Sequence, residues 1–241
     1  MRNSASFPIE AEQYLSVLFA RDHLIDPSFS ELLADSRKMS TQLNKTEISV
    51  SENEARILST LVASHECKKF VEIGTLTAYS ALWILRGLPE GGELFTFEKQ
   101  DSHARQALEV FNRFHQLADQ GALGFRGKRA HLYEGDAEEN LKIIEGQGPF
   151  DGIFIDGNKS AYGRYLDWAE SNLKKGGIIV ADNVFLKGAV WQQGLGHTNS
   201  VFSEKQIRVM QEFNQRLADS KSYQSVILPT IEGLFFAIKK F

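Results

Sequence analysis

The chain has 241 residues, 42% of them hydrophobic, and a formal net charge of -4 at pH 7. This length and apolar content suffice for one substantial core and do not require a second domain. Lys and Arg are scattered among Asp and Glu, which disfavours the concentrated basic stripe that binds nucleic-acid backbones. We therefore expect a single domain over residues 1–241, with nucleic acid disfavoured as a partner.

Cysteine content and apolar run length indicate the compartment. Cys67 is the single cysteine, so an intramolecular disulfide is impossible. The first residues lack a basic segment followed by a continuous apolar stretch, and no apolar run approaches the roughly 20 residues of a membrane-spanning helix. These features predict a cytoplasmic protein with no membrane partner.

Residues 1–66 are expected to form a helical N-terminal extension. Its clearer helices cover 28–43 and 51–66, where apolar residues recur at helical spacing. The second helix begins with a Ser51-to-Glu54 spacing that is typical of a capping box.

Residues 67–241 are expected to form an α/β core, because short apolar runs alternate with longer amphipathic stretches. The expected strands cover 68–74, 93–99, 130–136, 150–156 and 176–182. Helices are expected near 78–87, 101–119, 137–145 and 160–174, with the last one ending at Gly176-Gly177.

The C-terminal part departs from this alternation. Residues 186–206 are glycine-spaced and irregular, which predicts a long loop of the kind that often carries function. Two β-rich runs, 223–229 and 233–240, are joined by a short link and predict a hairpin. An antiparallel hairpin that closes a parallel sheet is compatible with a mixed sheet.

Acidic residues gather at the ends of the expected strands, where ligands bind in open α/β sheets. The residues at these ends are Glu72 with Gly74, Glu98, Asp136, Asp156, and Asp182 with Asn183. For any single acid, capping of the next helix is an equally good interpretation. The complete set favours a ligand site.

The first strand end predicts a nucleoside ligand rather than a dinucleotide. Only the first glycine of G-x-G-x-x-G is present, at Gly74, which disfavours nicotinamide and flavin cofactors. Glu98 is placed to accept hydrogen bonds from a ribose diol, and the helix that begins near Ser80 offers free N–H groups. A nucleoside without a pyrophosphate fits, and S-adenosylmethionine is the common one.

Asp156 and Asp182 end consecutive strands, which places them about 5 Å apart if the strands pair. Two carboxylates at that distance need a cation, a shared proton or a basic neighbour. Asn183 adds a third oxygen ligand beside them. This donor set favours a hard cation, Mg²⁺ first, with Mn²⁺ or Ca²⁺ as alternatives.

At these residues the sequence resembles the cation-dependent O-methyltransferases, a family that includes catechol and caffeoyl-CoA O-methyltransferases. The resemblance runs over roughly residues 48–240 and is strongest in 71–85, 97–100, 135–141, 150–184 and 233–240. It implies a Rossmann-like class I methyltransferase fold, with a seven-stranded, mostly parallel sheet, an antiparallel last strand and N-terminal helices.

The resemblance also implies roles for individual residues. It assigns the methionine part of S-adenosylmethionine to Glu72, Gly74, Thr75 and Ser80, the ribose to Glu98, the adenine to Asp136 and Ala137, and further cofactor contacts to Val50 and Asp156. It makes Asp156, Asp182 and Asn183 the metal ligands. Lys159 matches the general base of the family and acts with Asp156 in catalysis.

Two positions depart from the family pattern. Asn158 stands where a second acid is common, and Ala78 stands where glycine is usual in the cofactor loop. The loop 186–206, which contacts the methyl acceptor in family members, matches poorly. The sequence therefore leaves the identity of the acceptor open.

The resemblance implies a divalent-metal-dependent enzyme, a homodimer, that methylates a small aromatic vicinal diol of the catechol or caffeoyl type. Lys159 could simply pair with Asp156, but the rest of the set favours a role as base. Tyr162 and Tyr165 could line the acceptor site, but their three-residue spacing favours packing of the helix on the sheet. Phe185 and Trp191 fit a core role and a contact with an aromatic ring equally well. Two alternative functions remain: a tRNA hydroxyuridine O-methyltransferase and a noncatalytic cofactor-binding protein.

Overall fold

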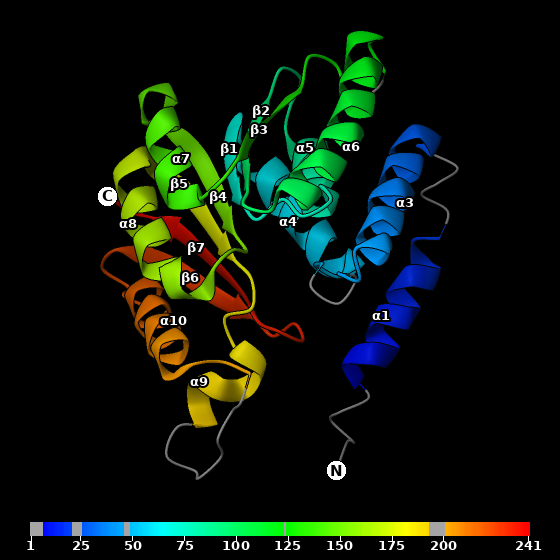
Figure 1. The fold of residues 1–241 in the computed structure, drawn as a ribbon. Helices are drawn as coiled ribbons and strands as arrows, with labels where there is room; N and C mark the ends of the chain where they lie inside the picture. The colour runs from blue at the N-terminus through cyan, green and yellow to red at the C-terminus, as the bar shows by residue number, and fades with distance from the viewer. Residues whose placement is uncertain (1–6, 21–25, 46–48, 123, 193–200) are drawn as a thin grey trace. The chain divides into compact units, whose positions relative to one another are not determined.

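A computed structural model describes residues 7–20, 26–45, 49–122, 124–192 and 201–241 of the chain (Figure 1). The chain divides into two compact units, each described below by itself. The first comprises Met1–Lys68 with Thr75–Gly135, and the second comprises Lys69–Gly74 with Asp136–Phe241.

The first unit combines helices with two parallel strands. Its elements are α1 (Phe7–Leu18), α3 (Pro27–Gln42), α4 (Glu52–Ser64), α5 (Tyr79–Gly87), β2 (Glu93–Glu98), α6 (Asp101–Asp119) and β3 (Arg129–Glu134). The capping box expected at α4 is confirmed, because the Ser51 side chain accepts from the Glu54 N–H and the Glu54 side chain accepts from the Ser51 N–H. The expected helix over 101–119 is confirmed as α6.

The second unit contains the remaining five strands and their helices. Its strands are β1 (Lys69–Ile73), β4 (Phe150–Ile155), β5 (Leu173–Ala181), β6 (Tyr223–Leu228) and β7 (Leu234–Lys239). Its helices are α7 (Ala137–Ile144), η2 (Glu145–Gln147), η3 (Lys159–Ala161), α8 (Tyr162–Asn172), η4 (Leu186–Gly188), α9 (Ala189–Gln192) and α10 (Glu204–Leu217). The predicted hairpin is confirmed as β6 and β7, which pair antiparallel.

Strand pairing confirms the expected mixed sheet, whose strand order is β3-β2-β1-β4-β5-β7-β6. Strand β1 pairs parallel with β4, and β4 pairs parallel with β5, whereas β7 runs antiparallel to both β5 and β6. The last paired residues of the parallel ladders are Ile73, Ile155 and Ala181. All three are buried, and the residues that follow them, Gly74, Asp156 and Asp182, lie at one edge of the sheet.

Two expectations about chain segments are wrong. Gly176 and Gly177 do not end a helix, because α8 already ends at Asn172 and both glycines lie inside β5. Gly176 has a φ of +78°, and the register of the β4–β5 pair shifts in this region. The two glycines therefore lie in an irregular part of the strand.

The predicted loop over 186–206 is also corrected in its described parts. Residues 186–192 form η4 and α9, and α10, which was not among the expected helices, begins at Glu204. Residues 193–200 of this prediction lie outside the described residues. Among the helices in the described part of the chain, none has the length and apolarity that crossing a bilayer requires.

We predict that Gly152→Ala in β4 destabilises the protein. A Cβ at this position would lie 2.5 Å from the Phe70 ring and 2.7 Å from Ile178 Cγ1, so the packed strands must move. Overpacking of this kind costs about 1–3 kcal/mol of unfolding free energy, measurable by urea denaturation. Gly163→Ala in α8 is the control, because its Cβ would meet no atom within 4 Å. Equal stability of the two variants would contradict the prediction.

Candidate active site

The site begins where β4 and β5 end beside each other. Asp156 follows Ile155, and its N–H donates to the carbonyl of Ile73 on β1 at 2.9 Å. Asp182 follows Ala181, and its N–H donates to the carbonyl of Ile155 at 3.0 Å. Because neighbouring strands lie about 4.8 Å apart, the ladder brings the two acids to adjacent positions at the sheet edge.

Asn183 follows in a left-handed backbone conformation, with φ of +59°. Its N–H donates to Asp182 Oδ1 at 2.7 Å, so the turn directs the acid and the amide to the same place. The next two residues are held by the hairpin, since Val184 and Phe185 donate to the carbonyls of Gly233 and Glu232. Asn is one of the few residues that adopt this conformation at little cost.

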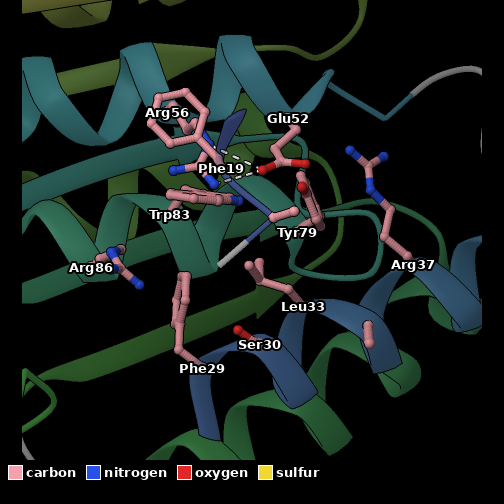
Figure 2. Close-up of a pocket in the computed structure, with 12 residues that line it drawn as sticks. Phe19, Phe29, Ser30, Leu33, Arg37, Glu52, Arg56, Tyr79, Trp83 and Arg86 are labelled. Atoms are coloured by element: carbon pink, nitrogen blue, oxygen red, sulfur yellow. Dashed lines mark hydrogen bonds and ion pairs between the residues drawn. The ribbon is translucent and has the colours of Figure 1, made fainter. Parts of the chain in front are cut away.

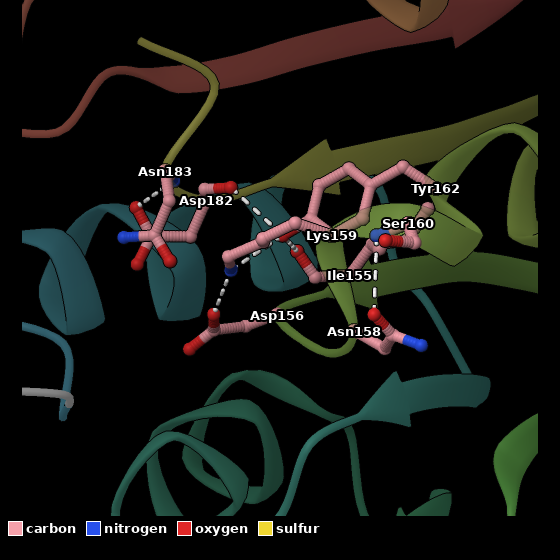
Figure 3. Close-up of polar contacts among 8 residues, drawn as sticks. All are labelled: Ile155, Asp156, Asn158, Lys159, Ser160, Tyr162, Asp182 and Asn183. Carbon is pink, nitrogen blue, oxygen red and sulfur yellow. Dashed lines mark hydrogen bonds and ion pairs between the residues drawn. The ribbon is translucent and has the colours of Figure 1, made fainter. Parts of the chain in front are cut away.

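Lys159 links the two strand ends through its ammonium group (Figure 3). Its Nζ lies 2.9 Å from Asp156 Oδ1 and 2.9 Å from the Tyr162 hydroxyl oxygen. The Tyr162 hydroxyl is the donor to two backbone carbonyl oxygens, that of Asp182 at 2.9 Å and that of Ile155 at 3.2 Å. Lys159 therefore touches one acid directly and reaches the backbone of the other through Tyr162.

The charge state of Lys159 follows from these neighbours. Burial alone lowers its pKa, but the Asp156 carboxylate and the Tyr162 hydroxyl outweigh burial and raise the pKa above the ordinary lysine value. Burial also raises the pKa of Tyr162, so its hydroxyl stays protonated. These contacts favour the ammonium form of Lys159 in this arrangement. Its role as a base stays a prediction.

The three candidate ligands suit a hard divalent cation. Asp156 and Asp182 supply carboxylate oxygens and Asn183 supplies an amide oxygen, the donor types that Mg²⁺ and Mn²⁺ prefer. Asp182 is only 4% exposed, and a carboxylate at such a depth calls for a compensating positive charge. Within the described residues no group of three or more His, Cys, Asp or Glu is placed to hold a metal. The candidate set accordingly depends on Asn183 for its third oxygen.

Gly74 lets the chain pass close to Asp156. Its φ is +99°, and a Cβ there would fall 2.2 Å from the Asp156 carbonyl oxygen. A larger residue would push the end of β4 away. The predicted cofactor glycine therefore also shapes the candidate metal site.

The predicted cofactor residues divide between the two units. In the first, Thr75 Oγ1 lies 2.5 Å from Thr96 Oγ1, and the Glu98 carboxylate accepts from the N–H groups of Leu76 and Gln100, each at 2.8 Å. Both Glu98 oxygens thus already accept backbone hydrogen bonds, although a carboxylate has about four acceptor positions and can take more. Ser80 is buried in the first turn of α5.

Helix α3 holds the loop of the predicted cofactor site, and the sequence did not predict these contacts. Ser36 Oγ, fully buried, donates to the Thr77 carbonyl at 2.6 Å, and Arg37 donates to the Val50 carbonyl at 2.7 Å. The loop has left-handed residues at Leu76 and Ala78, with φ of +50° and +70°. Because such backbone is strained for residues other than glycine, the buried bond from α3 stabilises the loop.

The other predicted cofactor residues belong to the second unit. Glu72 is fully buried in β1, and Ala137 is buried at the start of α7. Asp136 caps α7, since its Oδ1 accepts from the Glu138 N–H at 3.0 Å. The helix-capping interpretation is therefore confirmed for Asp136, and its predicted contact with adenine stays a prediction.

The aromatic residues near the site separate into two kinds. Tyr162 and Tyr165 are buried, so the expectation that they pack their helix is confirmed, and Tyr162 adds the polar role described above. Trp191 is 58% exposed, which excludes a core role, and its ring lies 5.1 Å from that of Phe185 in an edge-to-face arrangement.

Comparisons with known proteins agree with this geometry. A family model described as O-methyltransferase matches residues 25–240. A catechol O-methyltransferase of Niastella koreensis is 32% identical over 80% of this chain and 83% of its own length. Another, of Mycobacterium tuberculosis, is 28% identical over 85% of this chain and 84% of its own. The crystal structure of an O-methyltransferase from Bacillus cereus in complex with SAH superposes with a TM-score of 0.75, at 27% identity, and covers 96% of this chain and 97% of that one.

We predict that Tyr162→Phe lowers stability by about 1–3 kcal/mol, because the buried Lys159 loses a partner and the Asp182 carbonyl loses a donor. Tyr165→Phe is the matched control in the same helix, since the Tyr165 hydroxyl makes no hydrogen bond with the described residues. Its effect should stay within about 0.5 kcal/mol. Chemical denaturation of both variants measures the difference. A Tyr162→Phe variant as stable as the control would refute the proposed link.

Proposed function

Since the chain belongs to the O-methyltransferase family, we propose that it moves the methyl group of S-adenosylmethionine to a hydroxyl of a small aromatic vicinal diol, with a divalent cation bound at the sheet edge. The observation that supports this most directly is the pair of carboxylates at the ends of β4 and β5 with Asn183 beside them. The catechol O-methyltransferases among the relatives support an acceptor of this class.

The proposed cofactor site uses the residues assigned by the sequence: Val50, Glu72, Gly74, Thr75, Ser80, Glu98, Asp136, Ala137 and Asp156. The buried carboxylate of Glu98 supports a ribose contact, because its oxygens are fixed by two backbone amides. The cofactor already carries an activated methyl group, so the task of the protein is to hold donor and acceptor in line.

The proposed metal ligands are Asp156, Asp182 and Asn183. A cation bound by them would act as a Lewis acid that lowers the pKa of a coordinated hydroxyl and fixes its position. The hydrogen bond from the Asn183 N–H to Asp182 Oδ1 supports this assignment, because it orients the acid before any ligand binds.

Lys159 is the group that we assign to proton transfer, at its Nζ. Contacts with Asp156 and Tyr162 hold this atom at the sheet edge, three residues along the chain from the proposed ligand Asp156. The same contacts raise its pKa, so it can accept a proton only when Asp156 shares its negative charge with another cation. The position of Lys159 supports a role as proton acceptor, and that role requires a cation that shares the charge of Asp156.

The acceptor ring is proposed to lie against Phe185 and Trp191. Phe185 lies two residues after the proposed ligand Asn183, and Trp191 lies in the short helix that follows. The two rings contact each other, and the exposed Trp191 offers a surface for stacking. A homodimer, a cytoplasmic location and one domain over residues 1–241 remain parts of the proposal that rest on the sequence alone.

We expect purified protein to methylate a catechol in the presence of S-adenosylmethionine and Mg²⁺, and EDTA to abolish turnover. Added Mg²⁺ should restore it, because the proposed ligands bind the ion reversibly. Assays of methyl transfer to catechols, acyl-CoA phenylpropanoids, flavonoids and hydroxylated tRNA identify the acceptor class. Activity that survives thorough chelation would exclude the metal-dependent mechanism.

The variant Asp156→Ala should lose turnover but keep most of its affinity for S-adenosylmethionine, measured by calorimetry, because the other proposed cofactor residues are unchanged and Asp156 adds one further contact. Asp167→Ala is the control, because this aspartate lies on the exposed side of α8 in an ion pair with Arg216. Full activity in Asp156→Ala would contradict the assignment, and so would an equal loss in both variants.

A further inference from the structure

A cavity of about 380 Å³ lies inside the first unit, among helices α3, α4 and α5 and the residues Phe19 and Ala20 (Figure 2). This volume is within the range of small-molecule sites, about 300–1,000 Å³. None of the residues assigned to methyl transfer lines it. The cavity therefore requires an explanation of its own.

The lining carries an excess of positive charge. Arg37, Arg56 and Arg86 face the cavity, and Glu52 is the one acidic residue among the described residues that line it. Glu52 is engaged by Arg56, with its Oε1 at 2.6 Å from Nη2. Among the described residues, Arg86 pairs with the carboxylate of Asp26, whose Oδ2 lies 3.6 Å from Nη1. Arg37 donates to a neutral backbone carbonyl, so its charge has no carboxylate partner in the lining.

Aromatic rings fix the orientation of these guanidinium groups. The Arg37 carbon Cζ lies 3.5 Å from the centre of the Tyr79 ring, and Arg86 Cζ lies 4.6 Å from that of Phe29. Stacking on a ring occupies the flat face of a guanidinium and leaves its N–H groups pointing outward in the plane. Guanidinium groups held in this way are prepared to donate paired hydrogen bonds to a carboxylate or phosphate.

Trp83 provides a further donor in the same cavity. Its side chain is 4% exposed, and its indole N–H is buried without a hydrogen-bond partner in the described residues. Figure 2 shows the ring among the lining side chains, with its nitrogen turned toward the others. A buried donor without a partner costs about 1–3 kcal/mol, and an acceptor bound in the cavity would remove this cost.

We propose that this cavity binds a small organic anion, whose carboxylate or phosphate accepts hydrogen bonds from Arg37, Arg86 and the Trp83 indole. The rings of Phe29 and Tyr79 would contact the apolar part of such a ligand. The proposal needs no covalent step and does not depend on methyl transfer.

Binding of an anion in the cavity would also affect the proposed cofactor site, because Arg37 contacts residues of both. The guanidinium of Arg37 donates to the Val50 carbonyl and covers Tyr79, the residue before Ser80. An anion that binds Arg37 in the cavity would change the contacts of its guanidinium with Val50 and with Tyr79. This consequence rests on the proposed function, and by linkage each ligand would alter the affinity of the other by the same factor.

The test is a titration with benzoate and, separately, with phenyl phosphate, at constant ionic strength and without S-adenosylmethionine or metal. The intrinsic fluorescence should change saturably, with half-saturation below about 1 mM for at least one anion. The same titration of Trp83→Phe identifies the reporter, because the chain has three tryptophans. The two arms distinguish a carboxylate site from a phosphate site.

Arg86→Gln should weaken binding by about tenfold or more, as expected for a lost charged hydrogen bond. Arg113→Gln is the matched control, because Arg113 is a half-exposed arginine that pairs with Asp35 outside the cavity. Circular dichroism confirms that both variants fold. The proposal is overturned if neither anion binds at concentrations up to about 10 mM, on the order of ten times the expected half-saturation concentration. Equal affinity of the two variants for the anion would also overturn it.

Calorimetry with S-adenosylmethionine, with and without the bound anion, tests the coupling. A change of about fivefold or more in cofactor affinity supports it, and unchanged affinity overturns the coupling alone. Because anion binding is measured without the cofactor, a failure of the proposed methyl transfer leaves the first titration fully interpretable.

Discussion

The candidate active site depends on the register of three buried parallel strands. Ile73, Ile155 and Ala181 are the last residues of their ladders, and the residue after each emerges at the same edge of the sheet. Gly74, Asp156 and Asp182 occupy these three positions. A shift of one residue in either ladder would turn an acid toward the core, so the register specifies the chemistry as well as the fold.

The two acids at this edge would repel each other without a positive charge nearby. In the described arrangement the Lys159 ammonium supplies it, held by Asp156 and Tyr162. This arrangement explains why Tyr162 is fully buried and yet polar at its tip. Lys159 and a bound cation would share the negative charge of Asp156, which makes the protonation of Lys159 sensitive to the metal.

Much of the site could be predicted from the sequence, because apolar runs show where buried strands end. Asp156 and Asp182 were found in this way, and Asn183 followed from its position beside the second acid. The contacts of α3 could not be found, since Ser36 and Thr77 are 41 residues apart and neither belongs to a strand end. Lys159 and Tyr162 do have the three-residue spacing of one helix face, but only the fold shows that the hydroxyl reaches Asp182.

Errors in the fold prediction also have physical causes. The glycines at 176 and 177 suggested a turn, whereas they occupy an irregular strand whose register shifts. Helix α10 could have been predicted from the sequence, because Ser203 and Gln206 form a capping box ahead of buried residues at helical spacing. The irregular, glycine-spaced segment before it led to the expectation of a loop.

The most direct test of the account is the binding of Mn²⁺, followed by electron paramagnetic resonance, in the absence of any substrate. We predict saturable binding of one Mn²⁺ per chain, which Mg²⁺ displaces and which disappears in Asp182→Ala. Absence of a saturable site in the wild-type protein, or equal affinity in Asp182→Ala, would contradict the claim that the ends of β4 and β5 form a metal site.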